Sequence, residues 1–174
     1  MNPNAKLPPR PDPSSRPSRL PALGRRGGGW VVAQGVIFAL AAAIGWFGMP
    51  WPATARSWLW AAAAAAFVAG IVLLLAGGAG LGRQLTPFPR PLTTGELRQD
   101  GIYGLVRHPI YGGVILCLLA WGLASSPLAL VPFVLGAGFF DAKRRREEVW
   151  LLDQFPDYAN YRERIRRQFI PFVW

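Results

Sequence analysis

The sequence predicts an all-α integral membrane bundle of about four transmembrane helices with a cytoplasmic helical extension. Hydrophobic residues make up 52% of the 174-residue chain, and charged residues only 16%. Several long blocks contain no charge, and a helix needs roughly 20 mostly apolar residues to cross a bilayer. The basic residues are confined to a few segments between these blocks, which is typical of the loops on one side of a membrane.

Residues 1–29 form a basic tail that is rich in Pro, Arg, Ser and Gly. The tail contains almost nothing to bury, so we expect it to be disordered. The apolar run that follows exceeds the roughly 7–15 residues of a signal-peptide core. Although residues 53–55 imitate a cleavage site, we expect the first helix to be retained.

Residues 30–49 and 58–79 are the first two predicted membrane helices. Each has a tryptophan near an end, where an aromatic belt would lie. Gly78 and Gly82 have the GxxxG spacing that suits close contact between helices, and internal packing is the more common role of such a pair. Residues 86–91 contain three prolines and are predicted to be an extended connector over the cytoplasmic surface.

Residues 110–140 form a third apolar block, which is interrupted by two serines and a proline at 125–127. These residues are a turn signal, so the block is predicted to be a helical hairpin. Its second arm is expected to continue into the cytoplasm through residues 141–155, which lack Gly and Pro, until Pro156 ends the helix.

Residues 157–174 place apolar and basic side chains on opposite faces at helical spacing. They are predicted to form an amphipathic interfacial helix, with an apolar plug at residues 170–172.

The 19 Lys and Arg residues give the chain a net charge of +10, and only Arg56 among them lies in a loop assigned to the outside. Both termini and the 80–109 loop are therefore predicted to be cytoplasmic, which agrees with an even number of spans. This topology, together with attraction to anionic membrane lipids, accounts for most of the charge. No nucleic-acid partner is expected, because nucleic-acid modules usually interleave basic and aromatic residues on a soluble domain.

Arg-His-Pro-Ile-Tyr at 107–111 places the only histidine at the mouth of an apolar helix. Pro109 suits a first helical turn and biases His108 toward an extended conformation just outside it. The free N–H groups of that turn, with Arg107, are expected to face a polar pocket and to attract an anionic group. No metal is expected, since Cys117 and His108 alone cannot build a closed metal site.

Two adjacent carboxylates, Glu147 and Glu148, follow three arginines on the predicted extension. They point in different directions around a helix, so one can face a pocket while the other pairs with an arginine. Tyr158 and Tyr161 lie at helical spacing, which by itself indicates packing more often than ligand contact.

These pieces in this order resemble the isoprenylcysteine carboxyl methyltransferase family, its prokaryotic relatives and the related phospholipid methyltransferases. The resemblance runs from Gly101 to Phe172 and implies an integral membrane enzyme of the bacterial inner membrane that uses S-adenosylmethionine. Residues 30–174 would be the methyltransferase domain, and about 100–174 its cofactor-binding half. The implied cofactor-binding residues are Tyr103, Arg107, His108, Pro109, Tyr111, Gly113, Glu147, Glu148, Tyr158 and Tyr161.

Methyl transfer from a sulfonium requires an aligned donor and acceptor and the exclusion of water, but no metal or covalent nucleophile. Arg107 and His108 are expected to hold the methionine carboxylate, and one member of the glutamate pair its ammonium. An aromatic ring would offer a π-face to adenine or sulfonium. The candidates for that ring are Tyr103, Tyr111 and Trp150.

Arg164 and Arg167 are the predicted catalytic residues, with the role of orienting an anionic acceptor near the membrane surface. A carboxylate acceptor is already ionised at pH 7, whereas an ammonium must first lose a proton to His108 or a glutamate. The sequence leaves both acceptors open. We expect a small or lipid-like amphiphile that enters from the bilayer.

Two alternatives compete with methyl transfer. The C-terminal tyrosines and the Ile-Pro pair also resemble the membrane sterol-reductase superfamily, which would make the cofactor NADPH. A non-catalytic membrane scaffold or transporter would explain the hydropathy, but would leave the histidine, the carboxylates and the tyrosines without a role, and transporters often show repeats that this chain lacks.

Overall fold

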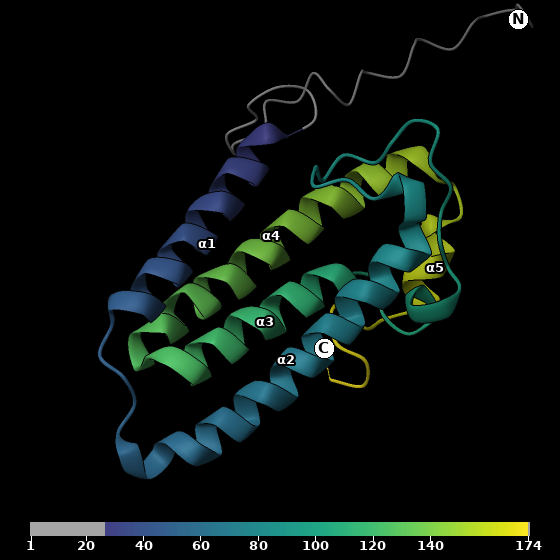
Figure 1. Cartoon of the computed structure of the whole chain (residues 1–174). Coiled ribbons are helices and arrows are strands. Elements are labelled where there is room, and N and C mark those ends of the chain that lie inside the picture. The colour runs from purple at the N-terminus through teal and green to yellow at the C-terminus, as the bar shows by residue number, and fades with distance from the viewer. Residues whose placement is uncertain (1–26, 174) are drawn as a thin grey trace, which may run out of the picture.

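The computed structural model describes residues 27–173, and this part of the chain is all-helical, with five α-helices and no strand (Figure 1). The predicted disorder of the tail therefore falls almost entirely outside the described residues. Short 3₁₀ turns, η2 to η4, join the helices. The elements are α1 (Gly28–Phe47), α2 (Ala53–Leu81), η2 (Gly82–Gln84), η3 (Gly101–Gly104), α3 (Pro109–Ser125), η4 (Pro127–Ala129), α4 (Leu130–Gln154) and α5 (Tyr158–Arg164).

Two helices, α1 and α2, are long and apolar enough to cross a membrane, with mean hydropathies of 1.9 and 2.4. Many of their large apolar side chains are exposed; Trp46 in α1 is 77% exposed and Trp58 in α2 is 80% exposed. A helix in the core of a soluble protein would bury such side chains. Helix α3 is apolar but shorter, and only the first half of α4 is apolar.

Helix α3 lies at the centre of the bundle, with α2 on one side and α4 on the other, while α1 packs against both α4 and α3 (Figure 1). Small residues bring α2 and α3 close together. A Cβ added to Gly113 would lie 2.7 Å from the carbonyl oxygen of Gly70. The two backbones therefore touch here, and side chains larger than hydrogen do not fit.

The predicted close contact at Gly78 and Gly82 is wrong. A Cβ on Gly78 would meet its nearest neighbour, Leu85, only at 3.9 Å, and a Cβ on Gly82 would meet nothing within 4 Å. Gly82 instead ends α2 with a φ of +52°, a conformation that glycine adopts without strain.

The helical hairpin predicted at residues 125–127 is confirmed. Helix α3 ends at Ser125, and the buried hydroxyl of Ser126 accepts a hydrogen bond from the N–H of Leu128 at 3.3 Å. Trp51, in the linker between α1 and α2, donates its indole N–H to the carbonyl of Gly122 at 3.0 Å. This contact ties the linker to the hairpin end of the bundle.

Helix α4 continues beyond its apolar half to Gln154, as predicted, and Phe155 and Pro156 follow its end. The predicted helix over 157–174 is too long, because α5 ends at Arg164. The chain then pairs with the segment before α3, where the N–H of His108 donates to the carbonyl of Gln168 at 2.7 Å.

Burial of Phe169 explains why the helix stops early. This side chain is 0% exposed and packs in a core cluster with Ile115 and Phe140. Gly112 leaves room for it, since a Cβ there would lie 2.1 Å from the carbonyl oxygen of Phe169. Phe169 is therefore inserted between α3 and α4 from a segment that is not helical. Ile170 packs against the same cluster, but Phe172 is 78% exposed, so the predicted apolar plug at residues 170–172 is wrong for its last residue.

Candidate functional site

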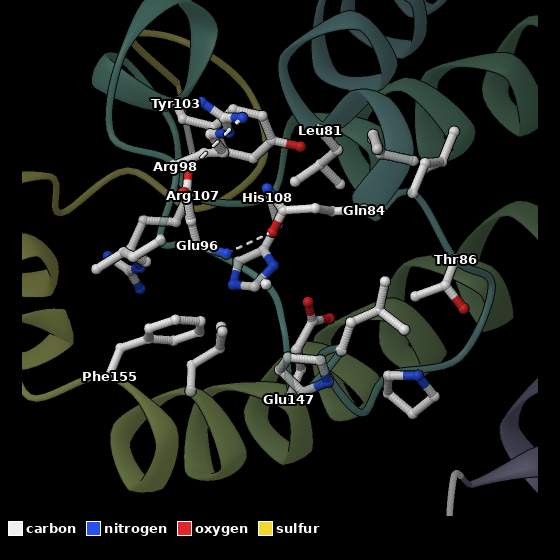
Figure 2. Close-up of a pocket in the computed structure, with 18 of the residues that line it drawn as sticks. Leu81, Gln84, Thr86, Glu96, Arg98, Tyr103, Arg107, His108, Glu147 and Phe155 are labelled. Carbon is white, nitrogen blue, oxygen red and sulfur yellow. Dashed lines mark hydrogen bonds and ion pairs between the residues drawn. The ribbon is translucent and has the colours of Figure 1, made fainter.

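A cavity lies at the end of the bundle where α2 ends, α3 begins and α4 extends beyond its apolar half (Figure 2). It encloses about 900 Å³ of space that protein atoms do not fill, its open mouth included. Much of the wall comes from the connector between α2 and η3, which we define as residues 82–98.

The mouth of α3 forms as the sequence predicted. Pro109 occupies the first turn of the helix, and His108 lies just outside it with φ −129° and ψ 60°. Both Arg107 and His108 are buried and line the cavity. The imidazole of His108 stacks on the ring of Tyr111, with 5.5 Å between centroids and 5° between planes.

Glu148 lies behind this wall in a network of cations. One of its oxygens is 3.1 Å from Nη2 of Arg107 and 3.1 Å from Nε2 of His108, and the other is 3.3 Å from Arg144. Burial alone would raise the pKa of Glu148, but the hydrogen bond from His108 and the three nearby positive charges lower the pKa to about 2. Glu148 does not line the cavity.

The guanidinium of Arg107 is largely engaged inside the protein. Besides Glu148, it donates to the carbonyl of Ile165 at 2.5 Å. The arrangement therefore does not support the predicted role of Arg107 in holding a ligand carboxylate, although the residue remains part of the cavity wall.

Glu147 is the carboxylate that faces the cavity (Figure 2). It accepts a hydrogen bond from the hydroxyl of Tyr111, and no described residue forms an ion pair with it. Burial raises its pKa, against the opposing effects of His108, Tyr111 and Lys143. Removing a carboxylate from water without a paired cation costs free energy, so a cationic ligand group that paired with Glu147 would lower this cost.

Three tyrosines form the aromatic side of the cavity. Tyr103 donates its hydroxyl to the carbonyl of Gly77 at 3.2 Å, and Tyr161 donates to the carbonyl of Tyr103 at 2.7 Å. Tyr158 is 1% exposed, yet its hydroxyl has no hydrogen-bond partner among residues 27–173. Buried hydroxyls are normally satisfied, so a ligand that reached this one would supply its missing partner.

Other predicted residues do not line the cavity. Pro109 packs against Gly77, and Gly113 serves the α2–α3 contact described above. The predicted catalytic pair lies outside as well. Arg164 donates to Gln99 at 2.6 Å, and Arg167 lies over the ring of Phe172 at 5.3 Å.

The sequence analysis missed the lining residues of the connector, including Phe88, Glu96 and Arg98, and also Phe155 at the end of α4. Arg98 forms a 3.9 Å ion pair with Glu96, and its Nε is buried without a partner in the described part of the chain. The prolines identified the connector as an extended segment. No spacing of polar residues indicated which side chains would turn toward α3.

Comparison of the chain with protein-family models gave no match, and no curated protein is significantly similar to it. Function must therefore be argued from the cavity. Its walls combine aromatic rings with a carboxylate that has no ion-pair partner, and a hydroxyl that has no hydrogen-bond partner, within residues 27–173. These groups suit a ligand that carries both a positive charge and an aromatic ring.

Proposed function

We propose that this chain is an S-adenosylmethionine-dependent membrane methyltransferase that transfers a methyl group to a lipophilic or amphiphilic acceptor at the cytoplasmic membrane face. The observation that carries the proposal is the carboxylate of Glu147, which faces the cavity without an ion-pair partner among the described residues. The resemblance of residues 101–172 to the isoprenylcysteine carboxyl methyltransferase family supports the same activity.

The residues of the cavity fit this cofactor. S-adenosylmethionine has an ammonium and a sulfonium, so Glu147 would bind one positive charge by a charge-assisted interaction. The rings of Tyr103, Tyr111 and Tyr161 would offer π-faces to adenine or to the sulfonium. The free hydroxyl of Tyr158 would meet a polar group of the nucleoside.

Bound S-adenosylmethionine supplies an electrophilic methyl group, whose carbon–sulfur bond breaks, with its electron pair passing to sulfur, as the acceptor forms a new bond to the carbon. The protein has to align the two reactants and keep water away. Glu147 and the tyrosines would orient the donor. The connector would cover the reacting groups, since it forms much of the wall.

The acceptor is a carboxylate or an amine on an amphiphile. Leu81, Leu85 and Phe88 supply an apolar part of the wall that suits its hydrophobic portion. An amine would have to lose a proton before attack. His108 lines the cavity and would accept that proton while Glu147 binds the cofactor.

We further propose that α3 and the apolar half of α4 complete a bundle of four spans in a bacterial inner membrane, with both termini cytoplasmic. Basic residues support this orientation, because among those that the structure describes only Arg56 falls at the opposite end of the bundle. The cavity would then lie at the cytoplasmic end, beside the charged half of α4.

The charge balance of the cavity favours S-adenosylmethionine over NADPH. NADPH carries several phosphate charges, which need a surplus of cations in the wall. Glu96 and Glu147 line the cavity, Arg98 faces Glu96, and Arg107 is engaged by Glu148. A polyanion would meet unpaired carboxylate charge here, whereas S-adenosylmethionine, with two cationic groups and one carboxylate, would bring a net positive charge.

The test is calorimetric binding to the full chain purified in detergent, with S-adenosylmethionine, S-adenosylhomocysteine and NADPH as separate ligands. We expect saturable binding of the first two and none of NADPH. Binding of NADPH alone would favour the reductase alternative, and binding of none of the three would favour a non-catalytic membrane protein.

A further inference from the structure

Lys143 is a buried cation on α4, four residues before Glu147, and it lies outside the cavity lining. Its side chain is only 2% exposed. Its ammonium donates to Oε1 of Gln34 in α1 at 2.8 Å and to the carbonyl of Pro87 in the connector at 3.1 Å. It also lies 5.2 Å from the centroid of the Tyr111 ring. Its partners are thus oxygens and rings, and no described carboxylate forms an ion pair with it.

We propose that Lys143 is a positioning residue for the cavity, which holds the connector in place over it and fixes the Tyr111 ring that orients the carboxylate of Glu147. This inference rests on the proposed function where it concerns cofactor affinity. Its effect on the connector can be measured without any ligand.

The connector depends on contacts of this kind because it contains no α-helix or strand. Two side chains of α4 donate to its carbonyls: Lys143 to Pro87, and Gln154 to Leu92 at 2.7 Å. Segments without regular structure of their own open at a lower free energy than helices do. The loss of either bond should therefore loosen the wall locally and leave the bundle intact.

Tyr111 links Lys143 to the cavity. Its ring lies beside the ammonium and stacks with His108, and its hydroxyl donates to Glu147. A cation next to an aromatic ring holds the ring in place through its quadrupole. The orientation of the ring fixes the direction of the hydroxyl, and hence the position of the carboxylate oxygens that face the ligand.

The ammonium of Lys143 also titrates in an accessible range. Burial lowers its pKa to about 8, against the opposing charge of Glu147. The titratable groups that face it are Tyr111 and Glu147, with His108 behind Tyr111, whereas Gln34 and the Pro87 carbonyl do not titrate. Because the neutral amine binds these partners more weakly, the contribution of Lys143 to affinity should be present below about pH 8 and lost above it.

The test compares Lys143→Met with Arg145→Met in the full chain in detergent. Methionine keeps the length of the side chain and removes a buried charge. Gln34 is only partly buried and Pro87 is exposed, so water can hydrogen-bond the oxygens that lose the ammonium. The variant is therefore expected to fold. Arg145 is the matched control, since its side chain is 72% exposed on the same helix.

In Lys143→Met, hydrogen–deuterium exchange should rise across residues 84–98 and stay unchanged in α2 and α3. Its affinity for S-adenosylhomocysteine should fall roughly tenfold at pH 7, and the difference from the parent should vanish by about pH 9. The ligand's own amine titrates equally in both proteins. Arg145→Met should match the parent in both measurements.

The possible failures are distinguishable. If the parent protein binds no S-adenosylhomocysteine, the proposed function is wrong. If hydrogen–deuterium exchange is also unchanged in Lys143→Met, this inference is wrong as well. A parent that binds, with a Lys143→Met variant of equal affinity at every pH, overturns the inference alone. If Lys143→Met does not fold, Gln34→Leu takes its place, because it removes one partner of the ammonium. Hydrogen–deuterium exchange and affinity equal to those of the parent protein in that variant would overturn the inference.

Discussion

Glu147 and Glu148 are adjacent on α4, but their carboxylates lie in opposite electrostatic environments. Glu148 contacts Arg107, His108 and Arg144 behind the cavity wall. Glu147 faces the cavity, and within residues 27–173 it accepts a hydrogen bond only from Tyr111. Consecutive helical residues point in directions about 100° apart, which is how one helix supplies both a structural and a ligand-facing carboxylate.

The first prediction concerns Glu147→Gln, which keeps the shape of the side chain and removes its charge. Affinity for S-adenosylhomocysteine should fall about tenfold or more, because the ligand's ammonium loses a charge-assisted partner. Thermal stability in detergent should be unchanged or higher, since glutamine resembles the protonated form that burial already favours. A loss of stability together with unchanged affinity would place Glu147 in the structural network instead.

Glu148→Gln should show the reverse pattern. Removal of the carboxylate leaves buried cations without their partner, which should cost about 3 kcal/mol or more of stability. The melting temperature and the fraction of folded protein after extraction measure this cost. If this variant has the melting temperature of the parent protein but binds no cofactor, then Glu148 contacts the ligand and the assignment of the two glutamates is wrong.

Low pH should lower the stability of the folded protein through protonation of Glu148. Its folded pKa of about 2 lies below the ordinary value of 4.5, so its stabilisation is fully present above pH 4.5 and is lost as the pH falls toward 2. The difference in melting temperature between parent and Glu148→Gln should therefore narrow across that window. A difference that stayed constant from pH 6 to pH 3 would contradict this account of the network.

Tyr158→Phe removes a buried hydroxyl that has no partner among the described residues. Stability should be unchanged or slightly higher, because an unsatisfied buried polar group is lost. Affinity for S-adenosylmethionine should fall several-fold. Arg164→Ala is the matched control outside the cavity, and its affinity should remain within about twofold of the parent's. A large loss in Arg164→Ala with none in Tyr158→Phe would restore the arginine to the site.

The packing between α2 and α3 provides a prediction that is independent of function. Gly113→Ala should lower the melting temperature strongly, because the new methyl group would lie 2.7 Å from the Gly70 carbonyl oxygen. Gly78→Ala, on the same pair of helices, should be neutral or stabilising, since the nearest described atom outside its own stretch of helix would be that of Leu85, at 3.9 Å. Equal melting temperatures for the two variants would show that the helices pack differently.

The helices and the mouth of α3 could be predicted because each depends on local sequence. Apolar length defines α1 and α2, the Ser-Ser-Pro turn defines the hairpin, and Pro109 defines the start of α3. The end of α5 could not be predicted. The sequence after Arg164 has helical spacing, but burial of Phe169 between α3 and α4 is a tertiary effect that overrides this local pattern.

The candidate site was predictable in its chemistry and less so in its arrangement. Glu147, Tyr158 and most of the predicted residues in the 103–111 segment line the cavity. They could be chosen because carboxylates and tyrosines at helix ends are visible in a sequence. Which glutamate faces the cavity depends on the rotation of α4, and the place of Arg164 depends on Gln99. The connector's contribution to the wall depends on tertiary bonds such as that from Gln154, which no local pattern indicates.

The most direct test of the central claim is photo-crosslinking of tritium-labelled S-adenosylmethionine to the full chain in detergent, followed by peptide mapping. We predict saturable labelling of peptides from residues 84–98, 103–111 or 147–161, which contain residues that line the cavity. Excess S-adenosylhomocysteine should abolish the label, NADPH should not, and Glu147→Gln should be poorly labelled. Labelling confined to other peptides, or labelling that S-adenosylhomocysteine does not compete away, would contradict the claim that this cavity binds the methyl donor.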